Sequence, residues 1–164
     1  MNKIRQICFA ALYVAIIVAI QTLLSSIIGI EFTTLLMCVA AIFFPFKLTL
    51  LISCSYCLIQ GVLFGFGDWL IVYFIYWNLI VTITYLLRNI CKKYTLVTAF
   101  VISINAFLIG VIFALEWLIL YGIEAALSYY AAGFIGDLTH LGFTFISTLI
   151  LYPILKRIIP KILK

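Results

Sequence analysis

The stretch Ala131-Ala132-Gly133-Phe134-Ile135-Gly136-Asp137-Leu138-Thr139-His140 opens the last long apolar segment of this chain. It holds the only histidine of the sequence, three residues after an aspartate. Residues three apart share one face of a helix, and ionisable groups at membrane depth are costly and mark functional sites by default. We therefore expect the rest of the chain to form a helical cup around the face that carries Asp137 and His140.

The composition places the chain among integral membrane proteins. Of its 164 residues, 68% are hydrophobic and 9% are charged, and the mean hydropathy is +1.36. Soluble domains are about half apolar and about a quarter charged, so a soluble fold is excluded. We expect a single membrane domain over residues 1–164, and we attribute the net charge of +5 to membrane anchoring rather than to a nucleic-acid partner.

Six apolar segments predict an all-α bundle of six transmembrane helices. They are expected at residues 7–28, 32–44, 48–64, 69–87, 96–117 and 127–155. The second is short because Pro45 ends it, and such a helix covers the bilayer poorly by itself. Lys3 and Arg5 before the first segment also fit a signal peptide, but that segment is long enough to cross a membrane and lacks a small-residue cleavage site.

The charged residues fall on alternate sides of these segments. All ten basic residues lie on one side, namely Lys3, Arg5, Lys47, Arg88, Lys92, Lys93, Lys156, Arg157, Lys161 and Lys164. By the positive-inside rule this side is cytoplasmic, so both termini are expected inside. Four of the five acidic residues lie on the other side, between segments or at a segment end, namely Glu31, Asp68, Glu116 and Glu124, and only Asp137 is expected in the interior of a span.

Aromatic residues recur at four-residue spacing along the fourth segment, at Trp69, Tyr73 and Trp77. Aromatic residues at the interface are common in any membrane protein, and this interpretation suits Trp117 and Tyr121. Trp77 lies about 12 Å into its segment at 1.5 Å per residue, which favours a stripe of rings that faces the bundle and stacks on a flat heterocycle. Packing against lipid is the alternative.

Eight residues are candidate ligand-binding residues: Asp137, His140, Asn78, Trp77, Tyr73, Trp69, Tyr130 and Glu116. A neutral imidazole both donates and accepts a hydrogen bond, which suits the edge of a heterocycle. Asn78 offers an amide beside the aromatic stripe, and Glu116 could attract a cationic ligand, although solvated loop acids are commoner. Asp137 and His140 could instead bond to each other or to the backbone and fix helix packing.

Small residues at Ala11, Ala15 and Ala19 form a row along the first segment. Small residues four apart let another helix approach closely. The row packs either within the bundle or against a separate membrane subunit, and the spacing does not separate the two.

Several of these features together resemble one known family. Gly65-Phe66-Gly67-Asp68-Trp69, which predicts a tight turn, follows Gly61 and leads into the aromatic fourth segment. With the alanine row and residues 132–140, it resembles the substrate-binding S component of energy-coupling factor (ECF) vitamin transporters over essentially the whole chain. The most specific part is Ala132-Gly133-Phe134-Ile135-Gly136-Asp137-Leu138-Thr139-His140, which is similar to the family's A-G-x-P-F-D-x-x-H segment.

The resemblance implies a protein of the bacterial plasma membrane that captures a water-soluble vitamin or vitamin precursor from outside. Such a protein joins a transmembrane coupling subunit and two cytoplasmic ATPases, and it tips over in the membrane to release its ligand inside. The alanine row would then face the coupling subunit. Because the chain carries no ATP-binding motif, we expect no enzyme activity and no cofactor.

Two other classes of protein also fit the sequence. A small secondary carrier or channel would work without ATPases, although the chain shows no clear internal repeat. An intramembrane enzyme using Asp137 and His140 would need a second nearby carboxylate or further metal ligands. Cys54 and Cys57 have zinc-like spacing, but no second pair accompanies them, so no metal site is expected.

Overall fold

The structure is a computed structural model that describes residues 3–24, 26–27 and 29–162. These residues form six α-helices and no strand: α1 (Lys3–Leu24), α2 (Thr33–Phe43), α3 (Phe46–Phe64), α4 (Trp69–Lys93), α5 (Thr95–Tyr121) and α6 (Ile123–Ile162). Five of the six, all except α2, are long and apolar enough to cross a membrane, so the chain is a multi-pass membrane protein by helix length and hydropathy. The all-α prediction with six helices is confirmed. The predicted end of the first span at residue 28, and Lys164, lie outside the described residues.

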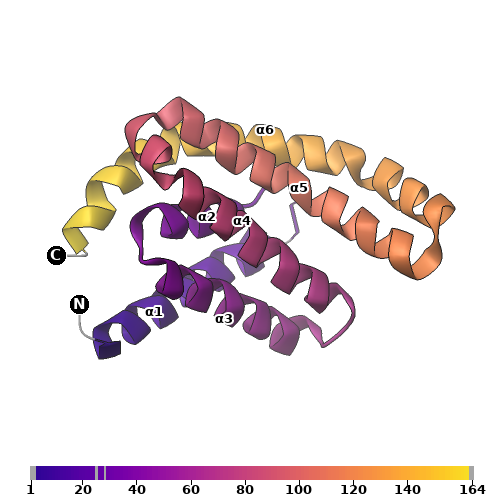
Figure 1. The fold of residues 1–164 in the computed structure, drawn as a ribbon, viewed down its shortest axis with the longest axis horizontal. Helices are drawn as coiled ribbons and strands as arrows, with labels where there is room; N and C mark the ends of the chain where they lie inside the picture. Colours follow the sequence, from indigo (N-terminus) through magenta and orange to yellow (C-terminus); the bar gives the residue numbers. More distant parts are fainter. Residues whose placement is uncertain (1–2, 25, 28, 163–164) are drawn as a thin grey trace.

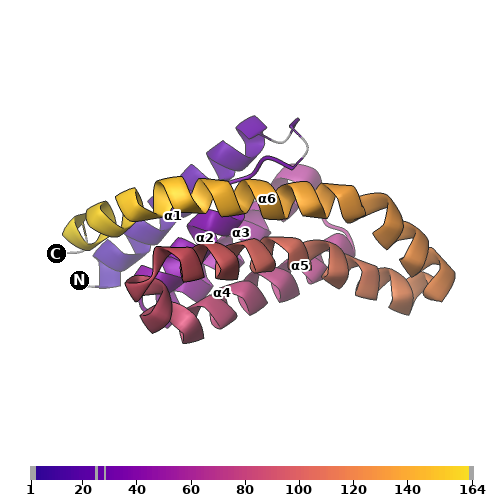
Figure 2. The same ribbon diagram turned by 90° about the horizontal axis from the view of Figure 1, so that it is seen from above.

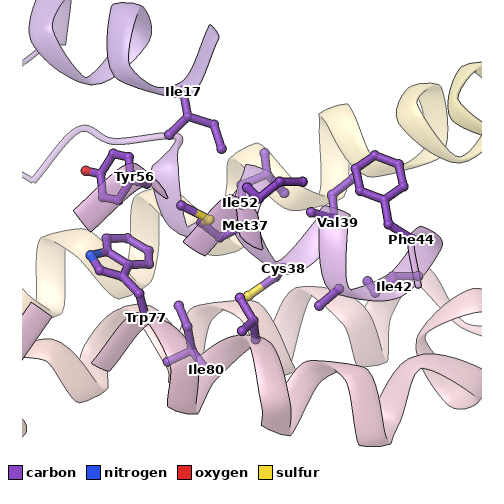
Figure 3. Close-up of a cluster of buried hydrophobic side chains, with 14 of the residues drawn as sticks. Ile17, Met37, Cys38, Val39, Ile42, Phe44, Ile52, Tyr56, Trp77 and Ile80 are labelled. Carbon is purple, nitrogen blue, oxygen red and sulfur yellow. The ribbon is translucent and has the colours of Figure 1, made fainter. Parts of the chain in front are cut away.

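Helix α2 is the centre of the bundle. Nine of its eleven residues are buried, and at 1.5 Å per residue it is about 16 Å long, roughly half of the hydrocarbon thickness of a bilayer. Figure 3 shows Met37 and Cys38 of α2 among side chains from α1, α3 and α4. The short second helix expected from Pro45 is therefore enclosed by protein, where the polar groups at its ends do not meet lipid.

Helices α5 and α6 form a long hairpin that extends past the turn between α3 and α4 (Figures 1 and 2). Only Gly122 separates them, and its φ of 86° is one that glycine adopts without steric cost. The helices therefore extend beyond the predicted spans, because α5 continues past residue 117 to Tyr121 and α6 begins at Ile123, with Glu124 in its first turn. Glutamate is a good helix former, and a negative charge in a first turn is stabilised by the helix dipole.

Both termini lie at the end of the molecule opposite the α5–α6 turn (Figures 1 and 2). The connection between α4 and α5 lies at this end as well, and there the Arg88 guanidinium lies 4.0 Å from the centre of the Tyr85 ring. Helix α4 continues to Lys93 instead of ending near residue 87, because Lys92 and Lys93 in its last turn stabilise the negative end of the helix dipole. The termini and this basic connection therefore share one end.

The turn between α3 and α4 is as tight as the sequence predicts. Gly65 ends α3 with a φ of 90°, and the Asp68 carboxylate accepts a hydrogen bond of 3.0 Å from the backbone N–H of Trp69 at the start of α4. Because α4 starts here, Tyr73 and Trp77 lie in the first half of this helix, nearer to the α3–α4 turn than to its basic last turn.

Candidate functional site

A cavity of about 200 Å³ lies among the end of α1, the connection that precedes α2, and helices α4, α5 and α6. Its lining includes Gln21, Glu31, Tyr73, Trp77, Ile109 and His140. Three of the eight predicted ligand-binding residues, Tyr73, Trp77 and His140, are thus brought to one cavity. These three come from two helices that are far apart in the sequence, so the fold itself assembles this wall.

Glu31 also lines this cavity, although it was not predicted from the sequence to be a ligand-binding residue. Its side chain is 8% exposed, it accepts a hydrogen bond from the Thr34 hydroxyl, and its Oε1 lies 3.8 Å from Nε2 of His140. The sequence places Glu31 in an outer loop, but α2 is so short that the residue before it lies inside the bundle, beside Tyr73 and Trp77. The sequence feature that could have identified Glu31 is an acidic residue just before an unusually short apolar helix.

His140 and Asp137 share α6 but have different neighbours. His140 faces Glu31 across the cavity, whereas the Asp137 carboxylate lies against the backbone of α5 at Gly110. No hydrogen bond joins the two side chains in the described part of the chain. Their spacing of three residues places both on one side of α6, as expected. Each side chain nevertheless contacts a different part of the protein. A ligand-binding role for Asp137 stays a prediction.

The aromatic stripe of α4 is a ladder of edge-to-face rings. The centroids of Trp69 and Tyr73 lie 5.1 Å apart at 89°, and those of Tyr73 and Trp77 lie 6.1 Å apart at 77°. Trp77 is 1% exposed, so at this position the lipid-facing alternative is excluded. Tyr73 and Trp77 reach the cavity, and Trp69 packs on Tyr73 from the side of the α3–α4 turn.

The remaining predicted residues lie elsewhere. Asn78 donates a hydrogen bond of 2.8 Å to the Phe74 carbonyl, one turn back in its own helix. Tyr130 lines a recess between α5 and α6, and Glu116 lies with Asp68 at a groove between α4 and α5. The fold does not bring these residues to the cavity of Glu31 and His140, and their role in ligand binding stays a prediction.

Buried polar contacts join α4, α5 and α2 beside Trp77. The Tyr76 hydroxyl donates a hydrogen bond of 3.0 Å to the backbone carbonyl of Asn105, and the Asn105 amide donates one of 2.9 Å to Thr84. The Asn105 amide also donates one of 3.6 Å to the fully buried Cys38 of α2. These contacts tie the three helices together next to Trp77, whose ring packs on Tyr76.

Gly29, in the connection before α2, lies against Thr139 of α6. Gly29 has a φ of 78°, and a Cβ atom built on it would overlap the side chain of Thr139. Thr139 precedes His140, so the contact holds the connection next to the imidazole. A residue without a side chain is required at position 29 for both reasons.

The alanine row of α1 lies on the outside of the bundle. Ala11, Ala15 and Ala19 are all exposed, whereas Val14 and Ile17 on the other face of the helix are buried. Of the two interpretations of the row, packing within this bundle is therefore wrong. A separate helix as its partner stays a prediction.

Comparisons of the chain with protein-family models, with curated proteins and with solved structures gave no match.

Proposed function

We propose that this membrane protein is the substrate-binding subunit, or S component, of an ECF-type importer. In this proposal it captures a water-soluble vitamin or vitamin precursor in the cavity of Glu31 and His140. The observation that carries the proposal is a cavity inside a membrane bundle that combines a buried carboxylate, an imidazole and two aromatic rings. Ligand sites are typically apolar hollows with a few convergent polar groups, and ionisable groups at membrane depth are expected to be functional.

The position of the cavity suits capture from outside the cell. Its lining includes Gln21 at the end of α1 and Trp77 in the first half of α4, whereas the basic residues of these helices lie at the start of α1 and the end of α4. Basic residues mark the cytoplasmic side. The buried contacts of Tyr76, Asn105 and Cys38 join α4, α5 and α2. Such packing between helices favours a protein that binds its ligand and moves as a unit over a carrier or channel with a continuous path.

The exposed surface of α1 is suited to contact with a helix of another membrane subunit. The exposed alanine row offers a smooth strip on which another helix can approach closely. The chain has no ATP-binding motif of its own. Import against a gradient would therefore depend on a coupling subunit docked on α1 and on two ATPases bound to that subunit.

The two alternatives predict different behaviour. A secondary carrier would take up its substrate without ATPases. An intramembrane enzyme built on Asp137 and His140 is less favoured, because the Asp137 carboxylate faces Gly110 and not the imidazole. The aspartyl type also needs two adjacent carboxylates.

Two measurements test the proposal. The protein is purified in mild detergent, and the small molecules extracted from it are identified by mass spectrometry. Uptake of the molecule found is then measured in cells that produce this chain with or without a coupling subunit and its ATPases. The expected result is a stoichiometric vitamin-like ligand whose uptake requires the ATPases. Uptake that is unchanged without ATPases, or chemical conversion of the ligand by the purified protein, contradicts the proposal.

A further inference from the structure

We infer that the ligand is a small positively charged nitrogen heterocycle, with its charged edge at Glu31 and its ring beside Tyr73 and Trp77. This inference rests on the proposed function, because it concerns the ligand of the same cavity. Three observations lead to it: a buried carboxylate, an aromatic wall and the size of the cavity.

The first observation is the charge of the site. Glu31 is 8% exposed, and its closest basic group among the described residues is His140, whose Nε2 lies 3.8 Å away. A carboxylate offers about four acceptor positions, and the Thr34 hydroxyl fills one of them. A buried charge is costly unless it is paired and hydrogen-bonded. A cationic ligand with N–H groups would supply the missing partners.

The second observation is the aromatic wall of the cavity. Tyr73 and Trp77 line it, and their ring centroids lie 6.1 Å apart. The Tyr56 and Trp77 rings pack edge to face with centroids 5.2 Å apart. Figure 3 shows the Tyr56 oxygen and the Trp77 nitrogen on the same side, directed away from Met37 and Cys38.

Glu31 requires donors at one edge of the ligand, and the rings of Tyr73 and Trp77 favour a flat ring beside that edge.

The third observation is size. The cavity has a volume of about 200 Å³, and an apolar cavity of roughly 150 Å³ holds benzene. One small ring with its substituents fits this space. The rings of Tyr73 and Trp77 at the wall favour a flat ligand.

Three probes of similar size and different charge test the inference. They are 1-methylnicotinamide, which is a cation with N–H groups on its carboxamide, nicotinamide, which is neutral, and nicotinate, which is an anion. Binding is measured by calorimetry with the purified full-length protein. We expect the cation to bind at least about tenfold more tightly than the neutral probe, because opposite charges attract more strongly in a buried site than in water, and the anion to bind least.

Matched variants locate the effect. Glu31→Gln should remove the preference for the cation, because it removes the negative charge from the cavity. Glu124→Gln, in an exposed part of α6, should bind as the unmodified protein does. Thermal unfolding of each variant shows whether it is folded.

Each outcome decides the inference. No binding of the cation, equal binding of all three probes, or a charge preference that survives Glu31→Gln overturns it. ATP-dependent uptake of an anionic or neutral vitamin would keep the proposed function and overturn the inference. Cation-selective binding by a protein that never joins ATPases would overturn the proposed function and leave the charge assignment of the cavity intact.

Discussion

The carboxylate of Asp137 in α6 fills the space that a side chain at position 110 of α5 would need. Gly110 therefore lets α5 and α6 approach with an ionisable side chain between them. Small residues at helix interfaces in membranes allow such close approach. Asp137 is therefore part of the packing between α5 and α6.

Gly110→Ala should destabilise the protein. The added methyl group overlaps the Asp137 carboxylate, and overpacking of this kind costs about 1–3 kcal/mol, which thermal unfolding in detergent measures as a lower midpoint. Gly133→Ala is the matched control, since a Cβ atom there meets none of the described atoms within 4 Å. The double variant Gly110→Ala with Asp137→Ala should lose less than the sum of the two single variants. Additive losses would contradict the close contact.

Gly29→Ala should disturb the connection before α2 more than an equivalent change elsewhere. Gly29 and Gly65 both have positive φ, at 78° and 90°, so alanine is strained at either position. Only at Gly29 does the new Cβ atom also overlap Thr139, next to His140, because at Gly65 no described atom lies within 4 Å. We expect both variants to lower the unfolding midpoint, but only Gly29→Ala to weaken ligand binding as well. Unchanged ligand binding by Gly29→Ala would show that the contact with Thr139 is unimportant for the site.

The broad fold could be predicted because composition and charge constrain it strongly. Alternation of basic and acidic residues along the chain indicated six segments, and Pro45 indicated the short second helix. The ends of α5 and α6 could not be found in this way. Glu116 and Glu124 suggested a loop, but charged glutamates extend helices well past an apolar core, and Gly122 alone reverses the chain.

The site could be predicted only in part, because contacts between distant segments are invisible in a sequence. His140, Tyr73 and Trp77 carry signals of their own, as a unique histidine and as rings repeated along one helix face. Glu31 carries no such signal and owes its burial to the length of the helix that follows it. Asn78 looked suitable by type, yet its amide bonds to its own helix.

Ala15→Trp tests the docking surface of α1. Ala15 is exposed, so the bulky residue should leave folding and ligand binding unchanged while blocking the close approach of a coupling subunit. We expect the variant to lose co-purification with the ATPases in a pull-down. Ile71→Trp, at a position of α4 that is 66% exposed, is the control for an added ring on another face. Normal co-purification of Ala15→Trp would remove the alanine row as the docking site.

The orientation of the protein can be tested by labelling single cysteines in intact cells. The five native cysteines are first replaced by alanine or serine, and Ile123→Cys and Tyr94→Cys are then introduced separately. Ile123 lies at the α5–α6 turn and is 66% exposed, and Tyr94 lies between α4 and α5 and is 50% exposed. Since basic residues surround Tyr94, the positive-inside rule places it in the cytoplasm. A maleimide that does not cross membranes should therefore label Ile123→Cys in intact cells, and Tyr94→Cys only after the cells are permeabilised. The reverse pattern would put the cavity on the cytoplasmic side and rule out capture of a ligand from outside.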